Sequence, residues 1–140
     1  MTTLAYHKPT NTIAYDSRTT AGSMIVSDKS QKAHKVGDIT FIMCGSRSDE
    51  EALINSHLNG GQRIHLDCNA LVIDKGLVYK IGQTEDDGLW SNILTDSFSL
   101  GSGSEWAIAA MDHGKNAREA VKYAMTRDTG TGGRVRVINI

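Results

Sequence analysis

The sequence has 140 residues, with 15 Lys and Arg against 16 Asp and Glu, which gives a formal net charge of −1. This length predicts a single domain over 1–140. A charge near zero argues against binding to nucleic acid or an anionic membrane, because both need clustered Lys and Arg. Hydrophobic residues make up 39% and aromatic residues 6%, which excludes global disorder and predicts a core of small aliphatic side chains.

Strands dominate the first third of the predicted fold. The stretch from Thr3 to Asp16 contains two β-rich runs separated by Lys8-Pro9-Thr10-Asn11, whose Pro and Asn suit a turn, and it predicts a β-hairpin. Residues 17–22 are small and polar and predict a loop. Apolar runs that predict further strands lie at 24–26 and 39–44, and residues 32–36 lead into the second of them through Gly37-Asp38.

A helix is predicted over 49–59. Ser48 and Glu51 have the spacing of a capping box, in which each side chain satisfies a backbone N–H of the other residue. Gly60-Gly61 ends the helix.

A second hairpin follows this helix. The apolar runs 70–73 and 77–81 flank Asp74-Lys75-Gly76, which predicts a three-residue loop with Gly at a position of positive φ. Residues 84–88 are acidic and predict a loop.

Two helices and a strand are predicted at the end of the sequence. The first helix covers 105–113, and the second begins at the cap residue Asn116 with Glu119 three residues later. The final strand covers 134–140. Because strands and helices are segregated along the chain, the pattern favours an α+β fold over a doubly wound parallel sheet. The apolar positions of the second helix form one stripe: Ala117, Ala120, Val121, Ala124 and Met125.

The sequence contains few signals for disulfides, membranes or bound groups. Cys44 and Cys68 lie in apolar surroundings and are interpreted as reduced, buried thiols. Neither a signal peptide nor a membrane-spanning segment is recognisable, which predicts a cytoplasmic protein. Gly101-Ser102-Gly103-Ser104 lacks the Gly-Lys-Ser/Thr end of a P-loop, and the five histidines show no metal-binding spacing. We therefore expect no cofactor and no metal.

Removal of Met1 would expose Thr2, and methionine is generally removed before a small residue. Thr2 would then carry a β-hydroxyl and a free α-amine on one residue. An α-amine has an ordinary pKa of about 7.7–8.0, so a modest downward shift leaves it neutral and able to accept the hydroxyl proton. Thr2 is therefore a candidate nucleophile with its own base.

The order of the motifs resembles the proteasome β-subunit and HslV family of N-terminal-nucleophile (Ntn) threonine hydrolases. The resemblance runs from end to end of the chain and implies a trimmed, four-layer αββα sandwich. It implies hydrolysis of peptide bonds in a peptide or unfolded-protein substrate, a homo-oligomeric ring, and an ATP-dependent unfoldase as a partner to test for. The matching segments are Thr2-Thr3, residues 16–23, Lys32, Met43-Cys44-Gly45-Ser46, residues 101–104, Arg127-Asp128 and Thr131-Gly132-Gly133.

The resemblance also implies roles for individual residues. Thr2 is the nucleophile, Lys32 the cation that lowers the pKa of its amine and hydroxyl, and Asp16 the carboxylate that holds Lys32. The N–H of Gly45 matches the oxyanion donor. The three residues that orient the amine in the family match Ser102, Asp128 and Thr131 of this sequence. Thr131 stands where the family usually has Ser. The positions that match the substrate site are Thr20, whose backbone pairs with the peptide, and Thr19, Ser30 and Met43, which line its pocket.

Three of these residues also have an ordinary structural interpretation. Asp16 suits a turn, Lys32 a solvated strand end, and Ser102 a helix cap. The family has a pair of helices after the Gly45 turn, whereas this sequence predicts one, 49–59. A non-catalytic, ring-forming assembly protein with a relic of the site is therefore the alternative to a peptidase.

Overall fold

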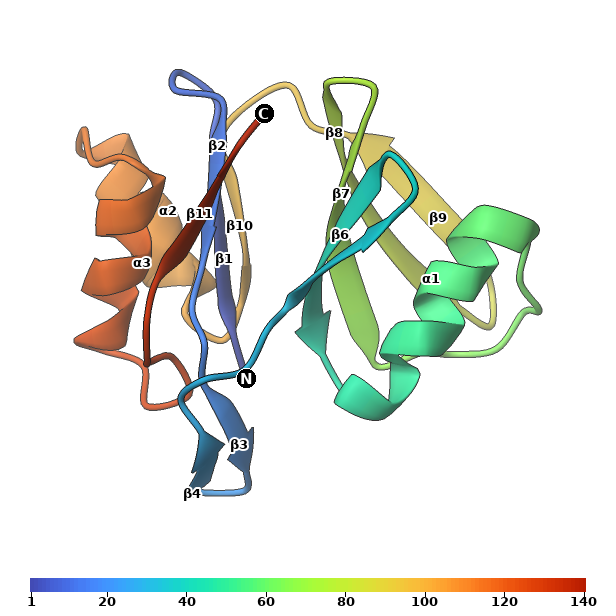
Figure 1. Ribbon diagram of the computed structural model, residues 1–140, viewed down its shortest axis with the longest axis horizontal. Coiled ribbons are helices and arrows are strands. Elements are labelled where there is room, and N and C mark those ends of the chain that lie inside the picture. Colours follow the sequence, from blue (N-terminus) through green and yellow to red (C-terminus); the bar gives the residue numbers. More distant parts are fainter. The chain divides into compact units, whose positions relative to one another are not determined.

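The computed structural model describes residues 1–140, which form two compact units (Figure 1). Unit 1 contains Met1–Lys32 and Thr95–Ile140, and unit 2 contains Ala33–Leu94. Each unit combines antiparallel strands with α-helix, so the predicted α+β composition is confirmed. The stacking of both sheets into four layers and the single domain over 1–140 stay predictions.

Unit 1 is built on a four-stranded sheet in the order β10-β1-β2-β11. The predicted first hairpin is confirmed, because β1 and β2 pair antiparallel from Leu4 and Tyr15 to His7 and Thr12. β1 is a central strand with a hydrogen-bonded neighbour on both sides. The strands are β1 (Thr3–His7), β2 (Thr12–Tyr15), β10 (Phe98–Gly101) and β11 (Arg136–Asn139), and a separate two-stranded ribbon consists of β3 (Thr19–Ala21) and β4 (Met24–Ser27).

Two helices cover one face of the unit 1 sheet, α2 (Ser104–Asp112) and α3 (Ala117–Met125) (Figure 1). α3 begins with the predicted capping box: Glu119 N donates to the Asn116 side chain at 2.9 Å, and Asn116 N donates to the Glu119 carboxylate at 3.1 Å. Small side chains allow helices and sheet to approach closely. The core between them contains Ala5, Ala14, Ala107, Ala110, Met111, Ala117, Ala120, Val121 and Val135.

Unit 2 is a five-stranded antiparallel sheet in the order β5-β6-β7-β8-β9, and one helix packs against β7. Leu53 of this helix is fully buried beside Phe41, Val72 and Ile81. A short 3₁₀ helix (Arg47–Asp49) precedes the α-helix. The elements are β5 (Ala33–Val36), β6 (Ile39–Gly45), α1 (Glu50–Asn59), β7 (Cys68–Asp74), β8 (Leu77–Thr84) and β9 (Gly88–Ile93).

The start of α1 differs from the prediction. The N-cap is Asp49, its side chain accepts no capping hydrogen bond, and the Ser48 hydroxyl lies 2.8 Å from that of Ser46. The preceding 3₁₀ turn shifts the first α-helical residue to Glu50, so Ser48 is no longer in the cap position. The capping box at Ser48 and Glu51 was therefore wrong, although the helix itself is confirmed.

Two connections also differ from the prediction. Asp74 pairs with Leu77, so the loop has two residues, and both Lys75 (φ 53°) and Gly76 (φ 76°) have positive φ. Positive φ at both positions is the pattern of a type I′ turn, which matches the twist of the flanking strands. Residues 17–22, expected to form only a loop, contain the strand β3.

The cysteines of unit 2 do not form a disulfide. Cys68 is buried, and burial, followed by the nearby charge of Glu50, raises the pKa of its thiol to about 12. Cys44 is only half-buried, in contrast to the expectation. None of the helices is both long and apolar enough to cross a bilayer.

Candidate active site

Thr2 directly precedes β1 and is 3% exposed, whereas Met1 is 59% exposed. The next residue, Thr3, pairs with Gly101 of β10. This pairing brings the following residue, Ser102, beside the first strand, and the Ser102 hydroxyl lies 3.4 Å from the Thr2 carbonyl oxygen. A central strand held at both edges thus fixes the position of Thr2.

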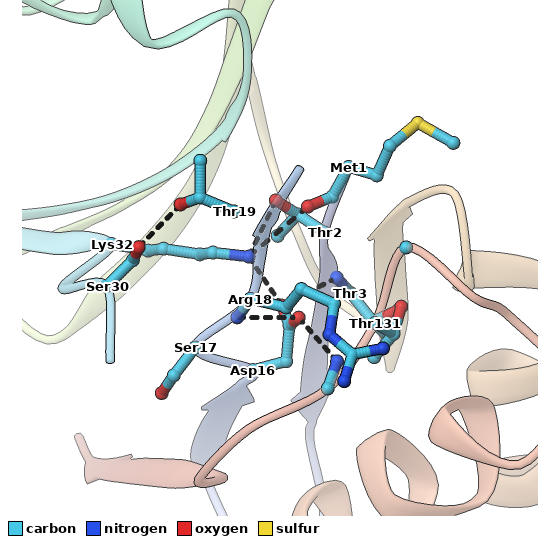
Figure 2. A network of polar contacts seen from close by, with 12 residues as sticks. Met1, Thr2, Thr3, Asp16, Ser17, Arg18, Thr19, Ser30, Lys32 and Thr131 are labelled. Carbon is cyan, nitrogen blue, oxygen red and sulfur yellow. Dashed lines mark hydrogen bonds and ion pairs between the residues drawn. The ribbon is translucent and has the colours of Figure 1, made fainter. Parts of the chain in front are cut away.

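The Lys32 ammonium contacts three oxygens around Thr2 (Figure 2). Its Nζ lies 2.7 Å from Asp16 Oδ1, 3.0 Å from Thr2 Oγ1 and 3.3 Å from the carbonyl oxygen of Met1. Because an ammonium group only donates, Thr2 Oγ1 accepts this hydrogen bond and keeps its own proton for another acceptor. The Lys32 and Asp16 side chains are 5% and 0% exposed, so water screens this ion pair only weakly.

The Asp16 carboxylate receives hydrogen bonds from four segments of unit 1. Oδ1 accepts from Lys32 Nζ and from the backbone N–H of Thr3 at 3.1 Å. Oδ2 accepts from the backbone N–H groups of Arg18 at 3.3 Å and Gly132 at 3.0 Å. A fully buried carboxylate needs such compensation. Asp16 therefore connects the first strand, the residues after β2, Lys32 and the loop before β11.

A second carboxylate, Asp128, accepts hydrogen bonds from a second group of polar residues, which includes Ser102 and Thr131. Its Oδ2 accepts from the hydroxyls of Ser102 at 2.5 Å and Thr131 at 2.6 Å, and its Oδ1 accepts from the N–H of Gly130 at 3.2 Å. The hydroxyl oxygens of Thr131 and Thr3 are 2.6 Å apart. The structure thus brings Ser102, Asp128 and Thr131 together.

The environment of Asp128 favours its ionised form. Burial alone raises the pKa of this carboxyl, but the hydrogen bonds from Ser102, Thr131 and Gly130, with the positive N-terminus, more than offset that effect. The net result is a pKa below its ordinary value of 3.8. Asp128 is therefore a carboxylate at neutral pH and accepts hydrogen bonds without donating any.

Three of the residues expected to contact substrate lie around the β3–β4 ribbon. The hydroxyls of Thr19 and Ser30 are 2.5 Å apart, as Figure 2 shows beside Lys32. Thr20 lies in β3 and pairs with Ile25 of β4. These contacts describe the ribbon, and the roles of the three residues stay predictions.

The remaining two predicted site residues belong to unit 2. Gly45 is the last residue of β6 and is exposed, and Met43 of the same strand is buried. The proximity of Gly45 and Met43 to Thr2 stays a prediction.

Sequence reasoning assigned no role to Thr3 or Arg18. Thr3 contacts Asp16 through its backbone N–H and Thr131 through its hydroxyl. Arg18 forms a two-point ion pair with Asp28 at 2.8 and 3.1 Å and donates to the Thr129 carbonyl at 3.1 Å. A signal for Thr3 existed: a hydroxyl in a strand flanked by apolar residues needs a buried partner. The partner of Arg18 is ten residues away, and the sequence contains no local pattern that selects Asp28.

Solved structures share this fold over almost the whole chain. Thiobacillus denitrificans BPH in complex with epoxomicin matches with a TM-score of 0.74 and 16% identity over 97% of this chain and 96% of that chain. A second structure of Thiobacillus denitrificans BPH matches with a TM-score of 0.73 and 17% identity, over 99% of this chain and 96% of that chain. Eukaryotic HslV from Trypanosoma brucei matches with a TM-score of 0.72 and 18% identity, over 97% of each chain.

These likenesses establish the fold. The chain shares the fold of HslV and BPH, as the sequence predicted. No protein-family model and no curated protein matches the sequence.

Proposed function

We propose that this protein is a threonine peptidase that uses Thr2 as its N-terminal nucleophile once Met1 has been removed. The observation that carries the proposal is the position of Lys32 Nζ, 3.0 Å from Thr2 Oγ1 and 2.7 Å from Asp16 Oδ1. A buried cation at this distance stabilises negative charge that develops on the threonine oxygen. The HslV-like fold supports the same chemistry.

The first half of the proposed reaction forms an ester. Thr2 Oγ1 attacks the carbonyl carbon of the scissile peptide bond, and its proton passes to the free α-amine of Thr2. The resulting oxyanion is stabilised by the backbone N–H of Gly45. When the intermediate collapses, the ammonium returns its proton to the leaving nitrogen, the amine product departs, and the acyl group remains on Thr2 Oγ1.

The second half releases the acyl group. A water molecule attacks the ester carbon and gives one proton to the Thr2 amine. The new tetrahedral intermediate then expels Thr2 Oγ1, which recovers that proton, and the carboxylic acid product leaves. Lys32 donates to Asp16 and to Thr2 Oγ1 and takes no part in these proton transfers.

Asp128, Ser102 and Thr131 are proposed to orient the amine. Ser102 contacts Thr2 and Thr131 contacts Thr3. Asp128 accepts from both of their hydroxyls and keeps a negative charge that attracts an ammonium group. Amine orientation matters because proton transfer depends steeply on distance and angle.

The proposal includes a substrate and an assembly. An extended peptide is expected to pair with the backbone of Thr20, while Thr19, Ser30 and Met43 line the pocket for its side chain. The fold is that of HslV, and we propose a homo-oligomeric ring in the cytoplasm, with an ATP-dependent unfoldase as the partner to test.

The non-catalytic alternative depends on whether Met1 stays attached. The Met1 carbonyl oxygen accepts a hydrogen bond from Lys32 Nζ at 3.3 Å, and the Met1 side chain lies against Gly130. While Met1 is attached, the nitrogen of Thr2 is an amide and cannot act as a base. A chain that keeps Met1 would be an inert assembly protein with the site residues in place.

The test is a matched pair of proteins that differ only in Met1. One retains Met1, and the other begins at Thr2 after cleavage of a removable N-terminal tag. Both are assayed with fluorogenic peptides, and both are incubated with a peptide boronate and with epoxomicin. Epoxomicin is chosen because it is the compound in complex with BPH, whose fold this chain shares. We expect turnover and a mass adduct only for the Thr2-started protein.

The outcomes separate the two candidate functions. Turnover by the Thr2-started form alone supports the peptidase and its N-terminal base. If that form is folded and assembled yet neither turns over peptide nor binds either probe, the assembly protein is the better description. Intact mass spectrometry of the protein from its native cell then shows which form the cell contains.

A further inference from the structure

Thr3 contacts both polar groups of the site, the Lys32–Asp16 pair through Asp16 and the Ser102–Asp128–Thr131 group through Thr131. It is 0% exposed, its backbone N–H donates to Asp16 Oδ1 at 3.1 Å, and its Oγ1 lies 2.6 Å from Thr131 Oγ1. It is also covalently joined to Thr2. Figure 2 shows Thr3 between Asp16 and Thr131, directly after the candidate nucleophile.

The direction of the hydroxyl hydrogen bonds follows from counting protons. Asp128 is ionised and only accepts, so the single proton of the Thr131 hydroxyl goes to Asp128 Oδ2 at 2.6 Å. Thr131 Oγ1 has no second proton to give. Thr3 Oγ1 must therefore donate to Thr131 Oγ1 across their 2.6 Å contact. The result is a directed chain from Thr3 through Thr131 to Asp128.

The Thr3 hydroxyl lies close to the backbone of Gly103. Gly103 is buried beside it, and a Cβ at position 103 would lie only 2.1 Å from Thr3 Oγ1 and 3.1 Å from Thr131 Oγ1. The Thr3 hydroxyl thus occupies the space that a side chain at 103 would fill. Glycine at 103 therefore leaves the space in which the Thr3 and Thr131 hydroxyls meet.

We propose that Thr3 is a positioning residue, which holds Thr2 in register between the Lys32–Asp16 pair and the Ser102–Asp128–Thr131 group. The inference rests on the proposed function, because it assigns Thr3 a part in the same reaction. Thr3 is fully buried, so it acts on the geometry of attack and leaves substrate binding unchanged. Its hydroxyl accordingly contributes to kcat and leaves KM unaffected.

The test compares Thr3→Val with Thr3→Ser in the Thr2-started protein. Valine keeps the shape and removes the donor, whereas serine keeps the donor. We expect Thr3→Val to lower kcat by about 10- to 100-fold with KM within about 3-fold of the parent. We expect Thr3→Ser to stay within about 3-fold in both constants. Thr12→Val is the matched control, because Thr12 lies in the same hairpin and its hydroxyl contacts Thr10 instead.

A second measurement does not depend on activity. The titration of the Asp128 carboxyl is followed by carbon-detected NMR in the parent and both variants. Loss of the Thr3 donor depolarises the Thr131 hydroxyl and weakens its hydrogen bond to the carboxylate. The pKa of Asp128 is therefore expected to rise in Thr3→Val and to stay at the parent value in Thr3→Ser.

The two readouts keep the two proposals apart. If the parent has activity, a Thr3→Val protein with parental kcat, or a Thr3→Ser protein that is as impaired as Thr3→Val, overturns the role of Thr3. If the parent has no activity, the proposed function fails and the Asp128 titration decides. An Asp128 pKa that does not change in Thr3→Val then overturns the inference.

Discussion

Lys32 is the side chain on which the proposed chemistry depends most directly. In the Thr2-started protein, we expect Lys32→Ala to lower kcat/KM for a fluorogenic peptide by about 10²-fold or more, because the cation beside Thr2 Oγ1 is lost. The variant also leaves Asp16 buried without its ion-pair partner, which costs about 3–5 kcal/mol of stability. Steady-state kinetics and thermal unfolding measure the two effects.

A double variant separates chemistry from folding. Asp16→Asn combined with Lys32→Ala removes the uncompensated charge, so stability should recover relative to Lys32→Ala while activity stays low. A folded Lys32→Ala protein with parental activity would refute the assignment of Lys32. Circular dichroism confirms that each protein is folded before its kinetics are compared.

Much of the site could be predicted because its residues lie in short motifs with a fixed order. Asp16, Lys32, Ser102, Asp128 and Thr131 are indeed brought together by unit 1, although their roles stay proposals. The contribution of Thr3 could not be read as easily, since its hydroxyl partner is 128 residues away. Contacts between residues so far apart in the sequence depend on which strands pair. No local sequence pattern indicates that pairing.

The N-terminus of α3 has a formed capping box, whereas the N-terminus of α1 has no side-chain cap. Asn116→Ala removes a capping box that is formed, and we expect it to lower the free energy of unfolding by about 0.5–2 kcal/mol. Ser48→Ala changes a residue that caps nothing, so it should stay within about 0.5 kcal/mol of the parent. Urea denaturation measures both. An equal loss in the two variants would contradict the assignment of the caps.

The elements that sequence patterns predicted well are those with strong local signals. The hairpin of β1 and β2 and the helix α3 have clear turn and capping residues, and both formed as expected. The start of α1 was misplaced because the 3₁₀ turn before it competes with the cap. The strand β3 was missed because residues 17–22 are small and polar, and its pairing with β4 overrides their weak local preference.

At the scale of the whole molecule, the proposed ring predicts self-association. Light scattering coupled to size exclusion at micromolar concentration should give a mass several times that of the 15.2 kDa chain. Rings arise when one surface of a protomer binds a different surface of the next and the rotation closes. A monomer of about 15 kDa under all buffer and concentration conditions would remove the ring and leave a stand-alone hydrolase or binding module.

The connections of Asp16 have a consequence for the timing of biosynthesis. This carboxylate binds Gly132, 116 residues later in the chain, and Asp128 and Thr131 also lie near the end of the sequence. Translation proceeds from the N-terminus, so a nascent chain lacks these partners until its last segment has emerged. The proposed peptidase therefore has no complete site on the ribosome. We therefore expect an unfinished copy of the proposed peptidase to be inactive until residues 128–132 have been synthesised.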